Sequence, residues 1–549
     1  MIALGLSGGF GHDAAACLVI DGRVVAMAEE ERLSRRKHAE DELPLQATRF
    51  CLEQAGVHPS DVDEVTLSWD SQRDPTAATM RRVADAIESD DLFRAAGTRP
   101  TPVSHHLAHA ASAFWPSGFD DAAVIVVDGN GEDVATSVWH GSADGLTPAY
   151  DLPSTQSLGH MYDAVVEYTG LGRRSAGKLM GLASYGDPAT DEIDFPRVDL
   201  TEDGYRLDVP DLDHLPSRDR FIELRRFWRS VLQRTFGEPF SAEDWSRMAL
   251  GEVPARHVRV AASAQRAING CLARLAERWT EKLSTRNVAL AGGVALNCTA
   301  NGALGRTGIA DALFIIPPAH DAGGALGAAL WTAVAHGDSL VRSDPFSPFL
   351  GPLPQEAEAV EEAVRLGLSV TGSGDIASEA ALRLERGEVI GWVQGRAEIG
   401  PRALGARSIL AAPRLSGTRD RVNDVKGRER WRPLSPSVSA SAAAEHFDGV
   451  VSPYMLMAVP AAASTVDVVP AVVHIDGSCR PQTVDGALGD PRYPSLLDEV
   501  ERRSGVGIVL NTSFNLAGEP IVSSGRDAVD TFTRSRLDAL VIGDAVITR

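Results

Sequence analysis

The feature that most constrains the fold is a strand-and-turn unit that recurs along the chain. Residues 2–29 read as a strand, a glycine-rich turn, a second strand, the tight turn Asp21-Gly22 and a third strand. Residues 122–139 repeat this plan, and their turn is predicted at Asp128-Gly129. Asp-Gly between apolar runs is a strong hairpin signal. Two such units in one chain predict an internally duplicated α/β framework.

Two further units place glycines where a strand passes into a helix. Residues 287–304 carry Gly292-Gly293 at this point, and residues 314–331 carry Gly323. Glycine turns of this kind expose backbone N–H groups at a helix N-terminus, where phosphate binds well. Several of them in a duplicated framework resemble the actin, hexokinase and heat-shock type of ATPase fold.

The rest of the chain predicts a second domain, because 549 residues are too many for one hydrophobic core. Residues 335–375 are rich in Pro, Ser and Asp, and we interpret them as a linker. Beyond it, separated apolar runs predict strands of a second α/β domain at residues 388–395, 454–459, 505–514 and 538–547. We therefore expect domains over residues 1–345 and 346–549.

Residues 396–437 form a basic segment within an acidic protein. They contain ten basic and four acidic residues, a net charge of +6, while the whole chain has a formal charge of −22. Arginine forks grip phosphate and carboxylate oxygens in pairs, so the segment predicts an anion site. A solvated basic surface is the alternative. Interleaved glycines and prolines favour loops here over one helix.

Lysine usage singles out two positions. Only four lysines occur among the 53 basic residues, and two of them, Lys178 and Lys426, lie in glycine-rich motifs. Where arginine fills nearly every generic basic position, a remaining lysine is one whose compact ammonium matters. A lysine at a helix end is the alternative for Lys178.

A metal site is predicted by His105 and His109, which share one face of a helix when four residues apart. Asp128 and Asp321 follow predicted strands that border the same cleft. Two imidazoles with one or two carboxylates suit Fe(II), Mn(II) or Zn(II). Structural histidines are the alternative, and His106 is the third histidine of the motif.

The bulk properties limit the partners. An acidic chain with no basic arm argues against a large nucleic-acid surface. The N-terminus leads directly into a predicted strand, so we expect no signal peptide, and no apolar run is as long as a membrane helix. Five scattered cysteines without paired spacing are typical of reduced thiols, so we expect a cytoplasmic protein.

The chain resembles the antibiotic and nodulation O-carbamoyltransferases, the family of the tobramycin and cephamycin carbamoyltransferases. The resemblance extends over nearly the whole chain and rests on long motifs taken together: SGGFGHDAAACLVIDGRVVAMAEEERLSRRKH, HHLAHAASAF, GKLMGLASYG, LAGGVALNC, DAGGALGAAL, GPRALGARSILA, HIDGSCRPQTV and LNTSFNLAGEPIV.

For the first domain the resemblance implies similarity to the tRNA threonylcarbamoyltransferases, whose ATPase-like fold holds iron. The implied metal ligands are His105, His109 and Asp321, with Asp128 as a fourth. The implied nucleotide contacts are Lys178, Gly181, Gly292, Gly293, Asn297 and Gly323.

For the second domain the resemblance implies a YrdC-type fold, with a Lys-x-Arg element at Lys426 and Arg428 and a Ser-x-Asn element at Ser513 and Asn515. Further residues that would hold or orient the substrates are Arg396, Arg402, Arg407, Arg432, Arg480, Asn511 and Thr512. An ordinary strand-to-helix turn with a serine cap is the alternative for the serine element.

The implied chemistry has two steps. Carbamoyl phosphate is cleaved to carbamate, which ATP captures as carbamoyl-AMP in the second domain. In the first domain an acceptor hydroxyl then attacks the carbamoyl carbon. His12 is the predicted base for that hydroxyl; a histidine satisfied by turn backbone is the alternative. The implied cofactors are ATP, a divalent metal, Fe(II) above others, and Mg²⁺ as a further ion.

The acceptor is not fixed by the sequence. We expect a small-molecule hydroxyl, with residues 190–260 as its binding loops, neither nucleic acid nor membrane as partner, and a homodimer as an allowed assembly. Two rival functions are a tRNA threonylcarbamoyladenosine-type modification enzyme and a non-catalytic ATPase-like binding protein. The net charge disfavours the first, and the Lys426–Arg428 and Ser513–Asn515 elements disfavour the second.

Overall fold

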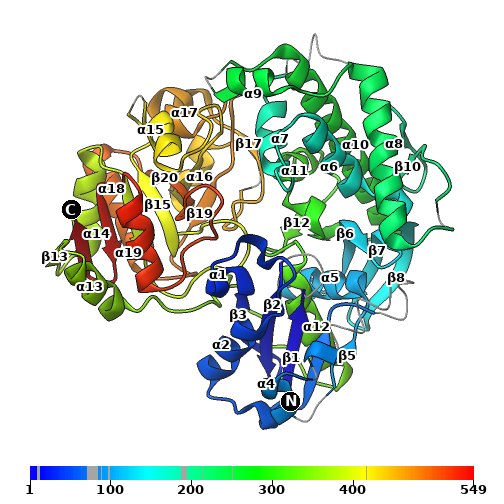
Figure 1. The fold of residues 1–549 in the computed structure, drawn as a ribbon, viewed down its shortest axis with the longest axis horizontal. Helices are drawn as coiled ribbons and strands as arrows, with labels where there is room; N and C mark the ends of the chain where they lie inside the picture. The colour runs from blue at the N-terminus through cyan, green and yellow to red at the C-terminus, as the bar shows by residue number, and fades with distance from the viewer. Residues whose placement is uncertain are drawn as a thin grey trace. The chain divides into compact units, whose positions relative to one another are not determined.

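The computed structural model (Figure 1) describes most of the chain. The described residues are 1–8, 13–70, 85–87, 89–96, 99–186, 194–212, 214–249, 252–415, 417–449 and 451–549. They divide into two compact units. The first contains nearly all described residues up to Phe346, and the second contains Ser347–Arg549.

The first sheet of the first unit has the strand order β3-β2-β1-β4-β5. Its strands are β1 (Ile2–Ser7), β2 (Ala15–Ile20), β3 (Arg23–Glu29), β4 (Glu64–Leu67) and β5 (Thr101–Pro102). Strands β1, β2 and β3 pair antiparallel, whereas β1, β4 and β5 pair parallel. The predicted turn joins β2 to β3, with φ of 48° at Asp21 and 72° at Gly22. Positive φ at both positions suits a tight hairpin between twisted strands.

The second sheet repeats this topology. Its order, β8-β7-β6-β11-β12, has the same pattern of antiparallel and parallel pairs. The strands are β6 (Ala122–Gly131), β7 (Val134–Ser142), β8 (Gly145–Pro153), β11 (Asn287–Ala291) and β12 (Ala312–Ile315). Five strands in the same order and directions confirm the predicted internal duplication.

One predicted turn is wrong. Asp128 and Gly129 lie within β6, and the hairpin turn is at Glu132-Asp133 instead. The pairing of β6 with β7 is irregular between Val127 and Gly131. The irregularity leaves the Asp128 side chain bound by groups outside the hairpin, among them the N–H of Gly293 at 2.7 Å. Sequence alone shows the Asp-Gly signal but not this non-local partner.

The helices of the first unit are α1 (Glu30–Ser34), α2 (Leu45–Ala55), α4 (Asp91–Ala96), α5 (His105–Phe114), α6 (Leu158–Tyr168), α7 (Ala176–Ala183), α8 (Ser217–Phe236), α9 (Ala242–Ala249), α10 (Ala255–Leu283), α11 (Cys298–Gly305) and α12 (Ala322–Ala335). Helices α2 and α12 pack on the first sheet, and α5 packs on the second. Strands β1 and β2 are therefore almost continuously buried rather than alternating.

Glycines bring α5 and α12 into backbone contact. A Cβ on Gly327 of α12 would lie 1.7 Å from the carbonyl oxygen of Ala108 in α5. A Cβ on Gly5 of β1 would lie 2.0 Å from the carbonyl oxygen of Ala325. No larger residue fits at either position without displacing backbone. This close packing joins the two halves of the duplication and sets the distance between the first turn of α5 and the start of α12.

The second unit is built on an eight-stranded mixed sheet with the order β13-β22-β21-β14-β15-β20-β16-β19. Its strands are β13 (Ser369–Gly372), β14 (Ile390–Val393), β15 (Arg407–Ala411), β16 (Ser435–Ser439), β19 (Gln482–Val484), β20 (Ile508–Ser513), β21 (Ala539–Ile542) and β22 (Ala545–Thr548). A separate two-stranded ribbon pairs β17 (Val459–Pro460) with β18 (Ser478–Cys479).

Helices cover both faces of this sheet. They are α13 (Glu356–Arg365), α14 (Ile376–Glu385), α15 (Thr418–Val425), α16 (Ala440–His446), α17 (Ala463–Val468), α18 (Arg492–Ser504) and α19 (Gly525–Arg534). In β20, Ile508 and Leu510 pack in one hydrophobic cluster with α13 and α19, while Val509 packs in the other with α14 and α18. Alternate side chains of a strand point to opposite faces, so one strand contributes to two cores.

Two segments predicted in the second half, a linker and a strand, are wrong. The linker predicted over 335–375 contains α13 and β13, whose apolar side chains complete the second unit. The strand predicted over 454–459 is a buried loop up to Ala458, and only its last residue joins β17. A buried loop and a buried strand both consist of short apolar runs, so the sequence alone does not distinguish them.

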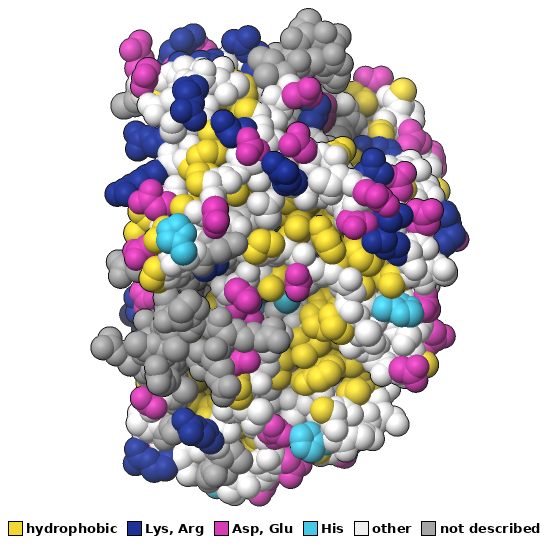
Figure 2. All heavy atoms as spheres, turned by 90° about the vertical axis from the view of Figure 1, so that its right-hand side faces the viewer, with side chains coloured by type: hydrophobic (Ala, Val, Ile, Leu, Met, Phe, Trp, Pro, Cys, Tyr) yellow, Lys and Arg dark blue, Asp and Glu magenta, His cyan; other side chains and the backbone are white. Residues whose placement is uncertain are grey.

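Charged side chains of both signs are interspersed on the face shown in Figure 2. Ion pairs join charged residues of the first unit; Arg278 and Lys282 of α10, for example, both bind Asp203. None of the described helices combines the length and hydropathy needed to cross a membrane.

Candidate functional site

The first candidate site lies where α5, α12 and β6 meet. His105 Nε2 lies 3.1 Å from His109 Nε2, 3.3 Å from Asp128 Oδ2 and 3.7 Å from Asp321 Oδ1. His109 Nε2 lies 4.0 Å from the same oxygen of Asp321. All four ligand atoms fall within 4.8 Å of one another. The structure therefore brings together the four residues that the sequence predicts as metal ligands, from both halves of the duplication.

Neighbouring groups fix the orientation of His105. Its Nδ1 faces the carbonyl oxygen of Ser68 at 3.3 Å, which leaves Nε2 directed at the cluster. Its backbone N–H donates to Glu132 Oε1 at 3.0 Å, and the N–H of Asp70 donates to the same oxygen at 2.6 Å. Glu132 thus caps the start of α5. Sequence reasoning missed this residue, since no local pattern marks a carboxylate that reaches a helix in another part of the fold.

Burial and charge give the two histidines opposite protonation. Burial disfavours the charged form of His105, but Asp128 and Asp321 outweigh it and raise the pKa of His105 to about 9. Burial and the neighbouring His105 lower the pKa of His109 well below its usual value. Burial also opposes the charge of Asp128, yet its contacts with His105 and His109 lower the pKa of Asp128. One histidine is protonated and the other neutral at pH 7.

The donor set fits a divalent metal ion. Two imidazole nitrogens that face each other at 3.1 Å repel unless a proton or a cation lies between them. Two nitrogens with two carboxylate oxygens suit a borderline ion such as Fe(II), Mn(II) or Zn(II). His106, in contrast, points elsewhere: its Nδ1 lies 2.8 Å from Ser137 Oγ, and burial lowers its pKa to about 3.

A second set of charged residues borders this cluster. His320, next to Asp321 in sequence, places Nε2 3.2 Å from Glu29 Oε1, and Glu29 pairs with Arg32 at 2.8 Å. Burial opposes a charge on His320, but Asp13 and Glu29 raise its pKa to about 9. Asp13 also lies 3.0 Å from Nδ1 of His38. The predicted base His12 lies outside the described residues.

The predicted nucleotide contacts of the first unit are mostly backbone positions under tight packing. A Cβ added to Gly292 would lie 2.3 Å from the carbonyl oxygen of Val127. A Cβ added to Gly323 would lie 2.1 Å from the carbonyl oxygen of Pro318. The N–H of Gly293 binds Asp128, as described above. Gly181 is buried in α7, and Lys178 is half-buried on the same helix. These residues lie on strand-to-helix turns and a helix of the first unit; nucleotide contact by them stays a prediction.

Asn297 has a structural partner. Its side-chain oxygen caps α11 by accepting from the N–H of Ala300 at 3.1 Å, and it also accepts from Gln265 at 2.9 Å. The residue is buried, with 6% of its surface exposed. In this arrangement the side chain holds α10 and α11 together, and a nucleotide contact would require it to exchange partners.

The second candidate site lies at the end of β20 in the second unit. The ammonium of Lys426 donates to the backbone oxygen of Ser513, to Asn515 O at 3.1 Å, to Asn515 Oδ1 at 3.0 Å and to Ser513 Oγ at 3.2 Å. Ser513 Oγ in turn donates to Asn515 Oδ1 at 2.6 Å. The structure therefore joins the Lys-x-Arg and Ser-x-Asn elements that the sequence predicts, although 87 residues separate Lys426 from Ser513.

Four cations gather here. Burial, together with Arg428 and Arg432, lowers the pKa of Lys426 well below its usual value. Burial, with Arg432 and Arg480, lowers the pKa of Arg428 in the same way, and burial also lowers that of Arg432. Arg428 Nη2 is buried without a hydrogen-bond partner among the described residues. Like charges around a buried lysine, with one buried donor left unsatisfied, form a site that an anion would stabilise.

Two other residues predicted to hold substrate in this unit, Arg407 and Arg396, bind backbone oxygens instead. The Arg407 guanidinium is fully buried and donates to five backbone oxygens, among them Ser523 O and Gly395 O. Arg396 likewise donates to Gly351 O and Leu350 O. These two arginines hold loops together. Their predicted contact with substrate would require these bonds to break.

Asn511, predicted to orient a substrate, lies in a buried hydrogen-bond network. Its amide nitrogen donates to Ser437 Oγ at 2.9 Å and to Gln482 Oε1 at 3.1 Å. Thr512 and Arg402 are half-buried. Arg480 donates to Ser435 Oγ at 2.9 Å through Nη2, and its guanidinium is close enough to Arg428 and Arg432 to lower the pKa of both.

Comparison with known families gives two matches that together span most of the chain. A family model described as Carbamoyltransferase N-terminus matches residues 2–89 and 84–330, and one described as Carbamoyltransferase C-terminus matches residues 381–549. Both candidate sites lie within the matched residues.

Curated relatives match over similar lengths. Nodulation protein NolNO of Sinorhizobium fredii is 38% identical over 590 residues, which cover 100% of this chain and 83% of the relative. Nodulation protein NolO of Bradyrhizobium diazoefficiens is 37% identical over 81% of this chain and 79% of its own length. Among solved structures, HypF of T. kodakarensis is 15% identical, with 63% of this chain and 49% of that chain covered at a TM-score of 0.37.

Proposed function

The chain belongs to the carbamoyltransferase family, and we propose that it is an ATP-dependent O-carbamoyltransferase acting on a hydroxyl of a small molecule. The observation that carries the proposal is the group of cations formed by the buried Lys426 and the half-buried Arg428, Arg432 and Arg480. Carbamoyl phosphate and ATP are polyanions, so their binding would relieve the repulsion among these four cations. Arginine and lysine side chains together can bind several phosphate oxygens.

The first half-reaction is assigned to the second unit. Water cleaves carbamoyl phosphate to carbamate and phosphate. A carbamate oxygen then attacks the α-phosphorus of ATP, the bond to the β-phosphate oxygen breaks, and pyrophosphate leaves with carbamoyl-AMP formed. The cations stabilise negative charge on the transferring groups. Ser513 and Asn515, which Lys426 contacts, would orient the carbamate.

The second half-reaction is assigned to the first unit. The acceptor hydroxyl attacks the carbamoyl carbon, the bond to the AMP phosphate oxygen breaks, and AMP leaves with an O-carbamoyl product. The hydroxyl proton goes to a base, for which the sequence predicts His12. A divalent metal bound by His105, His109, Asp128 and Asp321 would supply a Lewis acid close to the reacting carbonyl or phosphate. Glu132 and Ser68 keep His105 in the ligating orientation.

The test separates the two units. His109→Ala should lose bound metal and the transfer from added carbamoyl-AMP, and should keep pyrophosphate release from ATP and carbamoyl phosphate. A matched control is His336→Ala, since His336 is a half-exposed histidine at the far end of α12. Metal content is measured by elemental analysis. Stoichiometric metal in His109→Ala, or equal loss of both half-reactions, would contradict the assignment.

A further inference from the structure

We propose that the second unit contains a separate binding pocket for a small amphipathic carboxylic acid, with an apolar body about the size of a benzene ring and one carboxylate. The ligand is a free small acid. The proposal rests on a partly open apolar cavity, on an arginine at its mouth that has no partner among the described residues, and on the distance of both from the Lys426 cluster.

The cavity lies between α14, α18, the residues after β15 and the segment before β20. Its volume is about 140 Å³. The walls are apolar side chains of both helices and of the sheet, including Ala381, Leu384, Val469, Val500, Val506 and Val509. A dry apolar cavity of about 150 Å³ in another protein holds one benzene molecule, so an aromatic ring or a branched four- to five-carbon chain fills this space.

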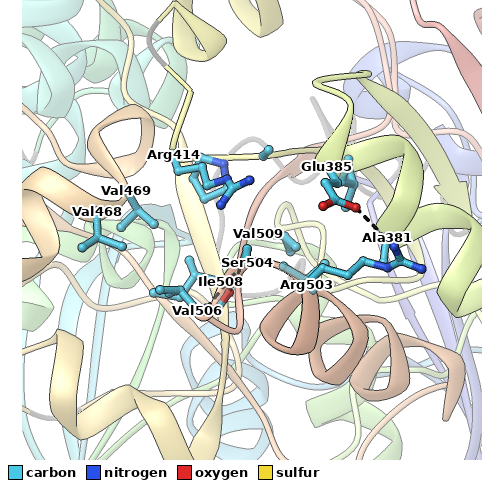
Figure 3. Close-up of a pocket in the computed structure, with 14 residues that line it drawn as sticks. Ala381, Glu385, Arg414, Val468, Val469, Arg503, Ser504, Val506, Ile508 and Val509 are labelled. Atoms are coloured by element: carbon cyan, nitrogen blue, oxygen red, sulfur yellow. Dashed lines mark hydrogen bonds and ion pairs between the residues drawn. The ribbon is translucent and has the colours of Figure 1, made fainter.

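The charges at the cavity leave one cation uncompensated. Two arginines and one glutamate line it, Arg414, Arg503 and Glu385. Arg503 Nη1 lies 3.2 Å from Glu385 Oε2, so this pair is neutral overall (Figure 3). Arg414 is exposed, and its guanidinium has no hydrogen bond or ion pair to any residue that the structure describes. Figure 3 shows Arg414 at the upper edge of the lining residues, with Ile508 and Val506 below it.

One free guanidinium beside an apolar cavity selects the class of ligand. The planar fork of arginine binds the two oxygens of a carboxylate in parallel. A nucleotide or polyphosphate would need more cations and a polar floor, and neither is present among the described lining residues. A neutral hydrocarbon would fill the cavity but leave Arg414 without a partner. A monocarboxylate with a compact apolar body satisfies both features.

The pocket is distinct from the site at Lys426. Ile508 and Val509 line the cavity at the start of β20, whereas Ser513 contacts Lys426 at its end. Four residues at about 3.3 Å each separate Val509 from Ser513 by roughly 13 Å along the strand. Ligands at the two places therefore do not overlap, and this proposal does not depend on the assigned function.

Arg414 is also a residue that the function leaves unexplained. It belongs to the basic segment 396–437, in which Arg396 and Arg407 bind backbone and Lys426, Arg428 and Arg432 form the cation cluster. Arg421 and Arg430 pair with Asp538 and Asp424. Arg414 has no such partner, although it immediately follows a buried proline at the cavity wall.

The test is calorimetric titration of the full chain with benzoate, and with benzamide as the neutral isostere. We expect saturable benzoate binding at millimolar concentration and at least tenfold weaker binding of benzamide. Arg414→Gln should weaken benzoate about tenfold, the effect of losing one charge-assisted contact, and leave benzamide unchanged. Val468→Phe should abolish binding of both, because Val468 lines the cavity and is partly exposed at its edge.

The matched control is Arg526→Gln, an arginine with 68% of its side chain exposed and no place in the cavity wall. It should bind benzoate as the wild type does. The proposal is overturned if the wild-type chain shows no saturable benzoate binding, if benzamide binds equally well, or if Arg414→Gln retains wild-type affinity. Competitive displacement of benzoate by ATP would overturn the separation of this pocket from the Lys426 site.

Discussion

Replacing Lys426 by alanine should remove the first half-reaction and spare the second. The ammonium contacts Ser513 and Asn515 through four acceptor atoms and lies beside Arg428 and Arg432. Its loss removes one cation from the phosphate site and also the anchor of the Ser-x-Asn element. Removing one preorganised donor from a transition state costs about 10² to 10³ in rate. With the serine element released as well, we expect a loss at the upper end of that range.

The assay is pyrophosphate release from ATP in the presence of carbamoyl phosphate. In parallel, transfer from added carbamoyl-AMP to an acceptor should stay within about twofold of wild type, because no step assigned to the first unit uses Lys426. Arg430→Ala is the matched control in the same segment: Arg430 has 59% of its side chain exposed and pairs with Asp424. If Lys426→Ala forms the adenylate at a near-normal rate, or if Arg430→Ala is equally damaged, the reasoning about the cation cluster fails.

The remaining predictions concern protons and packing. Since Asp128 and Asp321 raise the pKa of His105 to about 9 against its burial, a metal must displace a proton below that pH. Apparent metal affinity should fall about tenfold per pH unit below 9, whereas a flat profile in chelator competition would refute the protonated state. Nucleotide binding should raise the lowered pKa of Lys426, because bound anions favour its charged form; calorimetry over a series of pH values, in buffers of different ionisation enthalpy, should reveal proton uptake on binding, and buffer-independent heats at every pH would argue against it. Gly327→Ala should cost about 3 kcal/mol of unfolding free energy and lower metal content, while Gly177→Ala, with no atom within 4 Å of its Cβ, should not destabilise.

The parts of the fold that depend on local chemistry could be predicted from the sequence. Asp21-Gly22 forms the expected hairpin, and the Gly292-Gly293 unit passes from strand to helix. His105 and His109 share a helix face because their spacing matches one turn. In each case the signal lies within a few residues, so no knowledge of the tertiary structure is needed.

Features that depend on distant partners could not be predicted. The Asp128-Gly129 signal is overridden because Asp128 binds Gly293 from another strand-to-helix turn. Glu132 caps α5 from 27 residues away, with no pattern to mark it. Arg407 and Lys426 look alike in a basic segment, yet one holds backbone oxygens and the other reaches Ser513. Strand register and packing decide which basic side chain reaches the site, and neither can be predicted from the neighbouring residues in the sequence.

In the proposed function, one chain couples ATP cleavage at the α-phosphorus to carbamoyl transfer. Phosphorus-31 NMR of the wild-type chain with ATP, carbamoyl phosphate and a hydroxyl acceptor tests it most directly, because all phosphorus products appear in one spectrum. We expect AMP, pyrophosphate and phosphate in equal amounts, each matched by one O-carbamoylated acceptor molecule. Formation of ADP, or carbamoylation without consumption of ATP, would contradict it.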